Sequence, residues 1–202
     1  MTVFSSRLGT LACSLILSLS ILTPALAAPS KYLINKAVIQ EITDFINTDI
    51  VRLSLKNQNI KYNSLSQADI DALDKKWRGE TKSDEKPLIS AVLSNPLSSY
   101  LTRIQAHSIG LYSEMFVMDK NGLNVGQSNV SSDFWQGDEA KFQKTFGKGK
   151  GAVFIDEPEY DDKLGIWRVQ VNLAISNADN SAVIGAVTVE MNLSELERRS
   201  NI

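Results

Sequence analysis

The sequence feature that most constrains the fold is a regular alternation of apolar and polar side chains between residues 166 and 176. The apolar members are Trp167, Val169, Val171 and Leu173, and the polar members are Arg168, Gln170 and Asn172. Successive side chains of a β-strand point to opposite faces of its sheet. The pattern therefore predicts a strand whose apolar set faces the core and whose polar set faces water or a polar cavity.

Turn signals divide the second half of the chain into further strands. Asn121-Gly122 is a strong hairpin signal, because both residues tolerate the positive φ angles that tight hairpin turns require. We expect five strands, at residues 112–119, 123–128, 152–156, 166–176 and 182–192. A helix is expected at 133–146, and an acidic turn at 157–165.

The first half of the chain has helical periodicity. Apolar residues recur at spacings of three and four at Ile34, Val38, Ile42, Phe45, Ile46, Ile50 and Leu53. No glycine or proline interrupts this stretch, so one long helix is predicted over 31–57. Its apolar stripe can pack on one face of the sheet or form a homodimer surface, and both alternatives remain open. Shorter helices are expected at 66–78, 87–93 and 97–107.

Helices followed by a run of strands indicate an α+β domain with an antiparallel sheet. The chain has 202 residues, enough for one domain with a substantial core. We expect residues 28–202 to form a single domain, with the sheet region at 112–192.

Residues 1–27 have the composition of a secretory signal peptide. One charged residue, Arg7, precedes an apolar run from Leu11 to Leu22, and the segment ends in Ala25-Leu26-Ala27, a small-residue cleavage signature. We expect cleavage after Ala27 and export to a bacterial periplasm.

The composition argues against most catalytic chemistries and against nucleic acid as a partner. The only histidine is His107, and the only cysteine, Cys13, lies in the expected signal peptide. No nucleophile motif, zinc-ligand spacing or basic stripe is present, and the net charge is -2. The sequence therefore predicts a protein that is not an enzyme, with no cofactor and no metal.

One acidic segment has the composition of a cation site. Residues 156–162 contain five carboxylates, and oxygen-rich loops of this kind bind Ca²⁺. A solvated acidic turn is the favoured interpretation, so no metal is assigned there.

The stretch SSDFWQGDEAKF, residues 131–142, supports two interpretations. Ser132 or Asp133 can cap a helix, since their side chains accept from free backbone N–H groups. That interpretation leaves Trp135 and Gly137 without a role. A binding clamp would use both, with a ligand cation against the indole and Asp133 as its counter-charge.

Three motifs together resemble the Cache family, also called PDC, of PAS-like extracytoplasmic sensor domains. The first runs from Phe116 to Ser128 with the pattern D-x-x-G-x-x-x-x-x-S, and the second is D-x-W-x-G-D-E at 133–139. The third is the run Ile184–Val189. The resemblance covers residues 31–196 and is strongest over 114–189.

The resemblance implies a long N-terminal helix packed on a five-stranded antiparallel sheet, with a ligand pocket on the other face. Loops between the second and third strands would roof the pocket, and the ligand would be an amino acid, an amine, a carboxylate or a purine. The carried-over ligand-binding residues are Tyr112, Phe116, Asp133, Trp135, Gly137, Arg168, Gln170 and Asn172. In this scheme Arg168 would hold a carboxylate and Asp133 an amino group.

Two functions follow as expectations. The first is a periplasmic small-molecule binding module without its own membrane or effector domain, since the chain ends shortly after the last predicted strand. It would present its ligand state to a membrane-bound sensor kinase, cyclase or chemoreceptor. The alternative is a protein–protein interaction or dimerisation module with a vestigial pocket.

Overall fold

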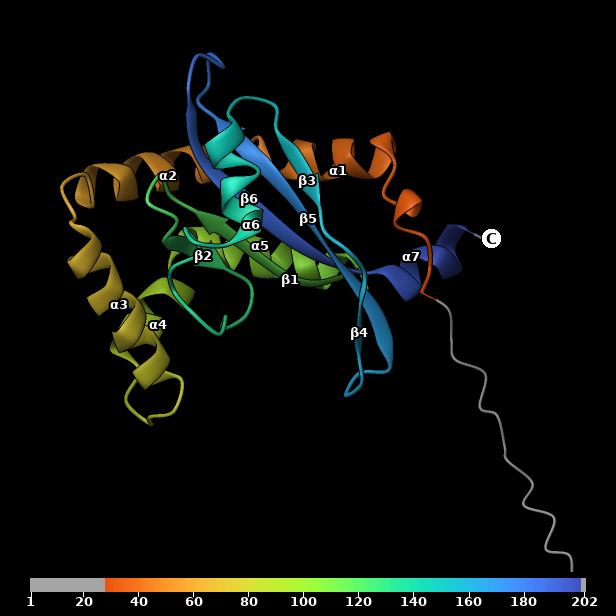
Figure 1. Ribbon diagram of the computed structural model, residues 1–202, viewed down its shortest axis with the longest axis horizontal. Coiled ribbons are helices and arrows are strands. Elements are labelled where there is room, and N and C mark those ends of the chain that lie inside the picture. The colour runs from red at the N-terminus through yellow and green to blue at the C-terminus, as the bar shows by residue number, and fades with distance from the viewer. Residues whose placement is uncertain (1–27, 201–202) are drawn as a thin grey trace, which may run out of the picture.

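The computed structural model describes residues 28–200 and shows an antiparallel sheet covered by helices, the α+β class that the sequence predicts (Figure 1). The expected signal peptide, 1–27, lies outside the described residues. Within 28–200, no helix is both long enough and apolar enough to cross a membrane.

The sheet occupies the predicted region but has six strands in place of five. They are β1 (Tyr112–Met118), β2 (Asn124–Gln127), β3 (Val153–Ile155), β4 (Glu159–Asp161), β5 (Ile166–Ser176) and β6 (Val183–Asn192). The order is β2-β1-β6-β5-β3, and all neighbouring pairs are antiparallel. The sixth strand, β4, pairs with the first part of β5, within the segment predicted as an acidic turn. A strand of three residues is too short to show a period in the sequence, so the segment reads as a turn.

The predicted single helix over 31–57 is wrong. The structure has a short 3-10 helix, η1 (Lys31–Leu33), followed by α1 (Lys36–Ile46) and α2 (Asp49–Lys61). Asn47 and Thr48 leave the helical region, with Thr48 in an extended conformation. Asn47, Thr48 and Asp49 are residue types whose side chains favour caps over helix interiors, which explains the break. The apolar stripe continues across it, so periodicity alone did not reveal it.

The remaining helices are α3 (Gln67–Glu80), α4 (Pro87–Leu93), α5 (Pro96–His107), α6 (Ala140–Gln143), η2 (Phe146–Lys148) and α7 (Leu193–Ser200). The predicted capping box at the start of α3 is present, with Ser66 and Asp69 bonding reciprocally. The helix predicted at 133–146 is wrong for its first half. Residues 133–139 are non-helical, and Trp135 instead forms an isolated bridge with Leu123.

The main core lies between one face of the sheet and helices α1, α2 and α5 (Figure 1). Val169, Val171 and Leu173 of β5 are buried in it, as predicted. The fourth member of the predicted inward set, Trp167, is partly buried and packs against the same cluster. A second cluster joins α3 and α4 to the loop that carries Phe134. The opposite sheet face carries a smaller cluster under α6, built on Phe116 and Phe142. This thin cover leaves space beside α6 for a polar cavity.

Candidate functional site

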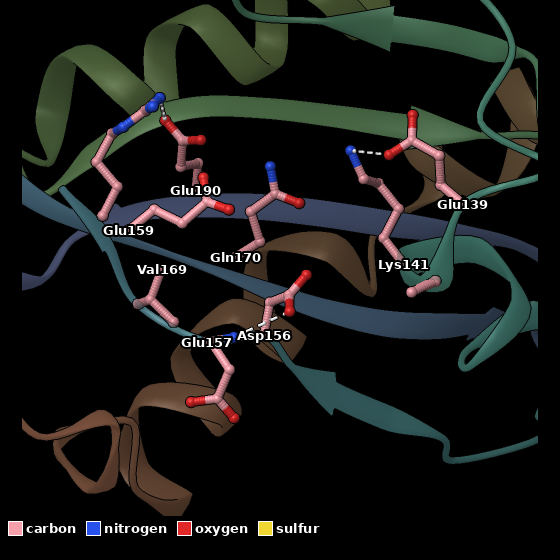
Figure 2. Close-up of a pocket in the computed structure, with 10 residues that line it drawn as sticks. Glu139, Lys141, Asp156, Glu157, Glu159, Val169, Gln170 and Glu190 are labelled. Carbon is pink, nitrogen blue, oxygen red and sulfur yellow. Dashed lines mark hydrogen bonds and ion pairs between the residues drawn. The ribbon is translucent and has the colours of Figure 1, made fainter. Parts of the chain in front are cut away.

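A polar cavity of about 260 Å³ lies on the α6 side of the sheet, the face turned away from the main core (Figure 2). Its lining residues are Glu139, Ala140, Lys141, Asp156, Glu157, Glu159, Arg168, Val169, Gln170 and Glu190. The volume is somewhat below the range of drug-sized pockets and suits a ligand as small as an amino acid or a short amine.

Strand register builds this cavity. The alternation of β5 places Arg168 and Gln170 on the same face, and β6 places Glu190 directly opposite Gln170. On the other side of β5, β4 places Glu159 opposite Arg168. The backbone N–H of Asp156 donates to the carbonyl of Gln170 at 3.0 Å. Figure 2 shows the side chains of Asp156 and Gln170 projecting toward the same space.

Both cations of the cavity are already paired with carboxylates. Arg168 donates from Nη1 to Oε1 of Glu190 at 2.8 Å, and its Nε lies 3.3 Å from Oδ2 of Asp161. The Nζ atom of Lys141 lies 2.9 Å from Oε2 of Glu139. A ligand carboxylate would have to displace one of these internal partners.

The carboxylates of the cavity outnumber its cations. Five lining residues are acidic and two are basic. Glu157, at the rim, is paired with Lys31 of η1. Within residues 28–200, Asp156 and Glu159 make no ion pair. The surplus gives the cavity a negative potential, which favours a cationic ligand group.

A further carboxylate, Glu114 of β1, is the direct partner of Glu190 on β6. Burial raises the pKa of Glu114 to about 7, and the neighbouring negative charge of Glu190 adds to the rise. Lys141 and Arg168 act in the opposite direction on the same pKa. Glu114 therefore changes protonation near neutral pH, next to the cavity.

Of the eight residues predicted to bind ligand, Arg168 and Gln170 line the cavity. Phe116 is buried on the same sheet face, and the Nζ atom of Lys141 lies 5.4 Å from its ring centroid. Asn172 is fully buried and internally bonded. Its Oδ1 accepts from Thr188 at 2.7 Å, and its Nδ2 donates to the carbonyl of Phe154 at 3.1 Å.

Tyr112 lies on the helix side of the sheet, within the main core. Its hydroxyl donates to Oε1 of Glu41 at 2.8 Å, and its ring centroid is 5.6 Å from that of Phe45. An irregularity between Tyr112 and Glu114 shifts the register of β1 against β6. The shift removes Tyr112 from the face that carries Glu114 and Phe116, since one extra residue reverses the alternation.

Asp133 and Trp135 belong to a loop that packs against α3 and the β1–β2 turn. Oδ1 of Asp133 accepts from Gln136 at 2.7 Å, and its Oδ2 lies 3.4 Å from Nη2 of Arg78. The indole N–H of Trp135 donates to the carbonyl of Asn121 at 2.8 Å. Oδ1 of Asp74 accepts from the backbone N–H of Trp135 at 3.1 Å. These contacts explain both residues structurally, and neither lines the cavity.

Gly137 is required by close packing. A Cβ atom at this position would overlap the indole of Trp135. A Cβ atom on Gly122, which has φ +81°, would lie 2.7 Å from Cα of Gly137. Residues 133–139 therefore pack closely against the β1–β2 hairpin turn. Arg168 lines the cavity and Asp133 does not, so the cavity lining includes one of the two side chains of the proposed zwitterion clamp.

None of the five carboxylates that line the cavity is among the eight ligand-binding residues predicted from the sequence. Asp156, Glu157 and Glu159 were noted as part of an acidic turn, and their number was the available signal. Glu190 could have been found from the register of β5 and β6. That register depends on the length of the intervening loop, which the sequence leaves undetermined.

Comparisons with known proteins identify solved structures only. No protein-family model matches the chain, and no curated protein matches it. Among solved structures, one similar to this chain is the ligand-binding domain of the Pseudomonas aeruginosa PAO1 amino acid chemoreceptor PctC in complex with GABA. It has 13% identity and a TM-score of 0.36, over 81% of this chain and 63% of that one.

Two other solved structures are also similar to this chain. The sensory domain of the Campylobacter jejuni chemoreceptor Tlp3 has 15% identity and a TM-score of 0.39, over 80% of this chain and 63% of that one. The extracellular domain of vpHK1S-Z8, described as a histidine kinase, has 10% identity and a TM-score of 0.45, over 81% of this chain and 52% of that one. This chain thus spans less than two thirds of each of the three. The structural neighbours are sensory and ligand-binding domains of chemoreceptors and a histidine kinase.

Proposed function

We propose that the chain is a periplasmic, non-enzymatic module that binds a small metabolite with at least one protonated amino group. Export would depend on the segment 1–27, and the bound state would be presented to a membrane-bound sensor kinase, cyclase or chemoreceptor. The observation that carries the proposal is the cavity beside α6, whose carboxylates outnumber its cations by five to two.

The ligand amine would sit between Asp156, Glu159 and Glu190. Asp156 and Glu159 make no ion pair within the described residues, so a cation can approach them without displacing an internal partner. The side-chain amide of Gln170 can donate to or accept from the same ligand. A charge-assisted hydrogen bond to each carboxylate is about twice as strong as a neutral one, which favours an amine over an alcohol of the same size.

The Cache resemblance of the sequence supports the same class of function. It predicts a pocket on the sheet face opposite the N-terminal helices, and the cavity lies on that face. Residues 133, 135 and 137 would fix the position of the loop that leads into α6. Glu139 and Lys141 lie at the start of that helix. In this proposal residues 133, 135 and 137 position the cavity wall and do not touch the ligand.

The test is a thermal-shift screen of amino acids, monoamines, diamines and carboxylates, followed by calorimetry on any ligand found. A ligand at 100 times its Kd should add about 2.7 kcal/mol to the free energy of unfolding. Asp156→Asn should weaken amine binding by about tenfold, whereas Asp84→Asn, in an exposed loop outside the cavity, should not change it. Binding of carboxylates alone, or equal binding by both variants, would contradict the proposal.

A further inference from the structure

A second and larger hollow, here called the α2 groove, lies between α2, the β1–β2 turn and the connection from β5 to β6. Its volume is about 820 Å³. The lining residues are Asp49, Arg52, Leu53, Lys56, Asn59, Ile60, Asn63, Lys120, Asn177, Ala178 and Ile184. The polar cavity beside α6 shares none of these residues.

Part of the lining of the α2 groove is apolar and open to solvent. Leu53 is 56% exposed and Ile60 is 66% exposed, and both belong to α2. Seven residues apart, they lie on one face of the helix about 10 Å from each other. Ile184 of β6 flanks them. Seven of the eleven lining residues are polar or charged, so the α2 groove combines an apolar part with a polar margin, as an amphiphile requires.

One side chain joins the three walls of the α2 groove. Asn59 of α2 donates from Nδ2 to the carbonyl of Ile184 at 2.8 Å, and its Oδ1 accepts from the backbone N–H of Lys120 at 2.9 Å. Behind it, a Cβ atom on Gly185 would overlap both Leu55 and the carbonyl of Met118, so α2 lies close against β6. The groove is therefore held in shape without a ligand.

The margin of the α2 groove is cationic, although the whole chain has a net charge of -2. Three bases, Arg52, Lys56 and Lys120, stand against one acid, Asp49. Arg52 is paired with Asp49 at 2.8 Å. Lys56 and Lys120 form no ion pair within residues 28–200, and Nζ of Lys120 donates to the neutral amide of Asn63. An anionic group at this margin would be favoured.

We propose that the α2 groove binds a free single-chain amphiphilic carboxylate, such as a fatty acid of medium length. The acyl chain would cover Leu53 and Ile60, and the carboxylate would meet the ammonium groups of Lys56 and Lys120. A free molecule is favoured over a membrane surface because the two apolar side chains line a hollow, whereas a bilayer meets a protruding face. This inference is independent of the ligand in the polar cavity.

The test is a calorimetric titration of the full mature chain with decanoate below its micelle-forming concentration. Decanol and decyltrimethylammonium, which share the chain length but differ in charge, serve as controls. Decanoate should bind with a stoichiometry of one and more tightly than either control. Lys120→Glu should weaken it by about threefold to tenfold, the range expected for reversing one partly exposed charge.

Two substitutions test the acyl-chain site. Leu53→Asp or Ile60→Asp should abolish decanoate binding, while circular dichroism shows the same fold, since both side chains are largely exposed. Leu164→Asp is the matched control, because Leu164 is 64% exposed and lies outside the groove. The amine affinity of the polar cavity should be unchanged in all three variants.

Four results would overturn this inference. The first is that decanoate and decyltrimethylammonium bind equally well, and the second is that the Ile60→Asp variant still binds decanoate. The third is that the protein binds only vesicles of anionic phospholipid. The fourth is that the protein dimerises through Leu53 and Ile60 and does not bind decanoate. Vesicle sedimentation distinguishes a membrane surface from a free acyl chain. Sedimentation velocity distinguishes a second copy of the chain.

Discussion

Glu114 of β1 and Glu190 of β6 are direct cross-strand partners, and Arg168 donates to Glu190 at 2.8 Å. Burial, with the negative charge of Glu190, raises the pKa of Glu114 from 4.5 to about 7. A carboxyl group with a higher pKa in the folded state binds more protons there than in the unfolded chain. Its ionisation therefore lowers stability as pH rises from about 4.5 to 7, and the loss is complete above 7.

Glu114→Gln should stabilise the protein above pH 7 and have little effect near pH 4.5. The expected gain at pH 8 is roughly 1 to 3 kcal/mol, because one pKa unit corresponds to about 1.4 kcal/mol. Urea unfolding of both proteins at pH 4.5 and at pH 8 measures the difference. A gain of the same size at both pH values would show that packing, and not ionisation, is responsible.

Amine binding in the polar cavity should be coupled to the same proton. A bound cation lowers the pKa of a nearby carboxyl group, so the affinity should rise as pH increases through about 7. Calorimetry at pH 6 and pH 8, in buffers of different ionisation enthalpy, measures both the affinity and the protons released. The Glu114→Gln variant should release fewer protons and show a flatter pH profile, and an unchanged profile would remove Glu114 from the linkage.

Gly137→Ala should destabilise the protein by about 1 to 3 kcal/mol, because its Cβ atom would overlap the indole of Trp135. Gly147→Ala is the matched control. A Cβ atom there meets nothing within 4 Å, so the change should be close to neutral. Thermal unfolding of the two variants provides the comparison. In a Trp135→Ala background the cost of Gly137→Ala should shrink, and full additivity would place the strain elsewhere.

Glu80 should act as a remote cap for α4. Its buried Oε2 accepts from the backbone N–H groups of Leu88 and Ile89 at 2.8 and 2.9 Å, while the N-cap residue Lys86 makes no side-chain bond. Glu80→Ala leaves two donors unsatisfied and should cost about 2 to 3 kcal/mol. Glu80→Gln retains a carbonyl acceptor and should cost clearly less in urea unfolding. Equal losses would mean that the negative charge, rather than the hydrogen bonds, stabilises this helix.

The fold was predictable where a regular pattern coincided with a buried face. The alternation in β5, the hairpin at Asn121-Gly122 and the capping box at Ser66 are all confirmed. The single helix over 31–57 was wrong because apolar periodicity survives a break of two residues at Asn47 and Thr48. Strand β4 was missed because it has three residues, Glu159–Asp161, too few to show a period, and its pairing is with β5.

The site was less predictable than the fold. Arg168 and Gln170 reach the cavity because the polar face of β5 is a property of the strand itself. Tyr112 does not, because an irregularity in β1 turns it to the helix side. Trp135 and Gly137 resemble parts of a binding clamp in the sequence, but in the structure the indole of Trp135 packs on Gly137.

The sequence by itself determined the α+β class, the positions of five of the six strands and the polar face of β5, since these depend on periodicity and turn signals within short segments. Only the tertiary structure decided which carboxylates share the cavity. Asp156, Glu159 and Glu190 come from three segments, and they meet through pairing with β5. Register depends on bulges and loop closure, which are properties of the assembled sheet, and a shift of one residue would turn these side chains to the other face.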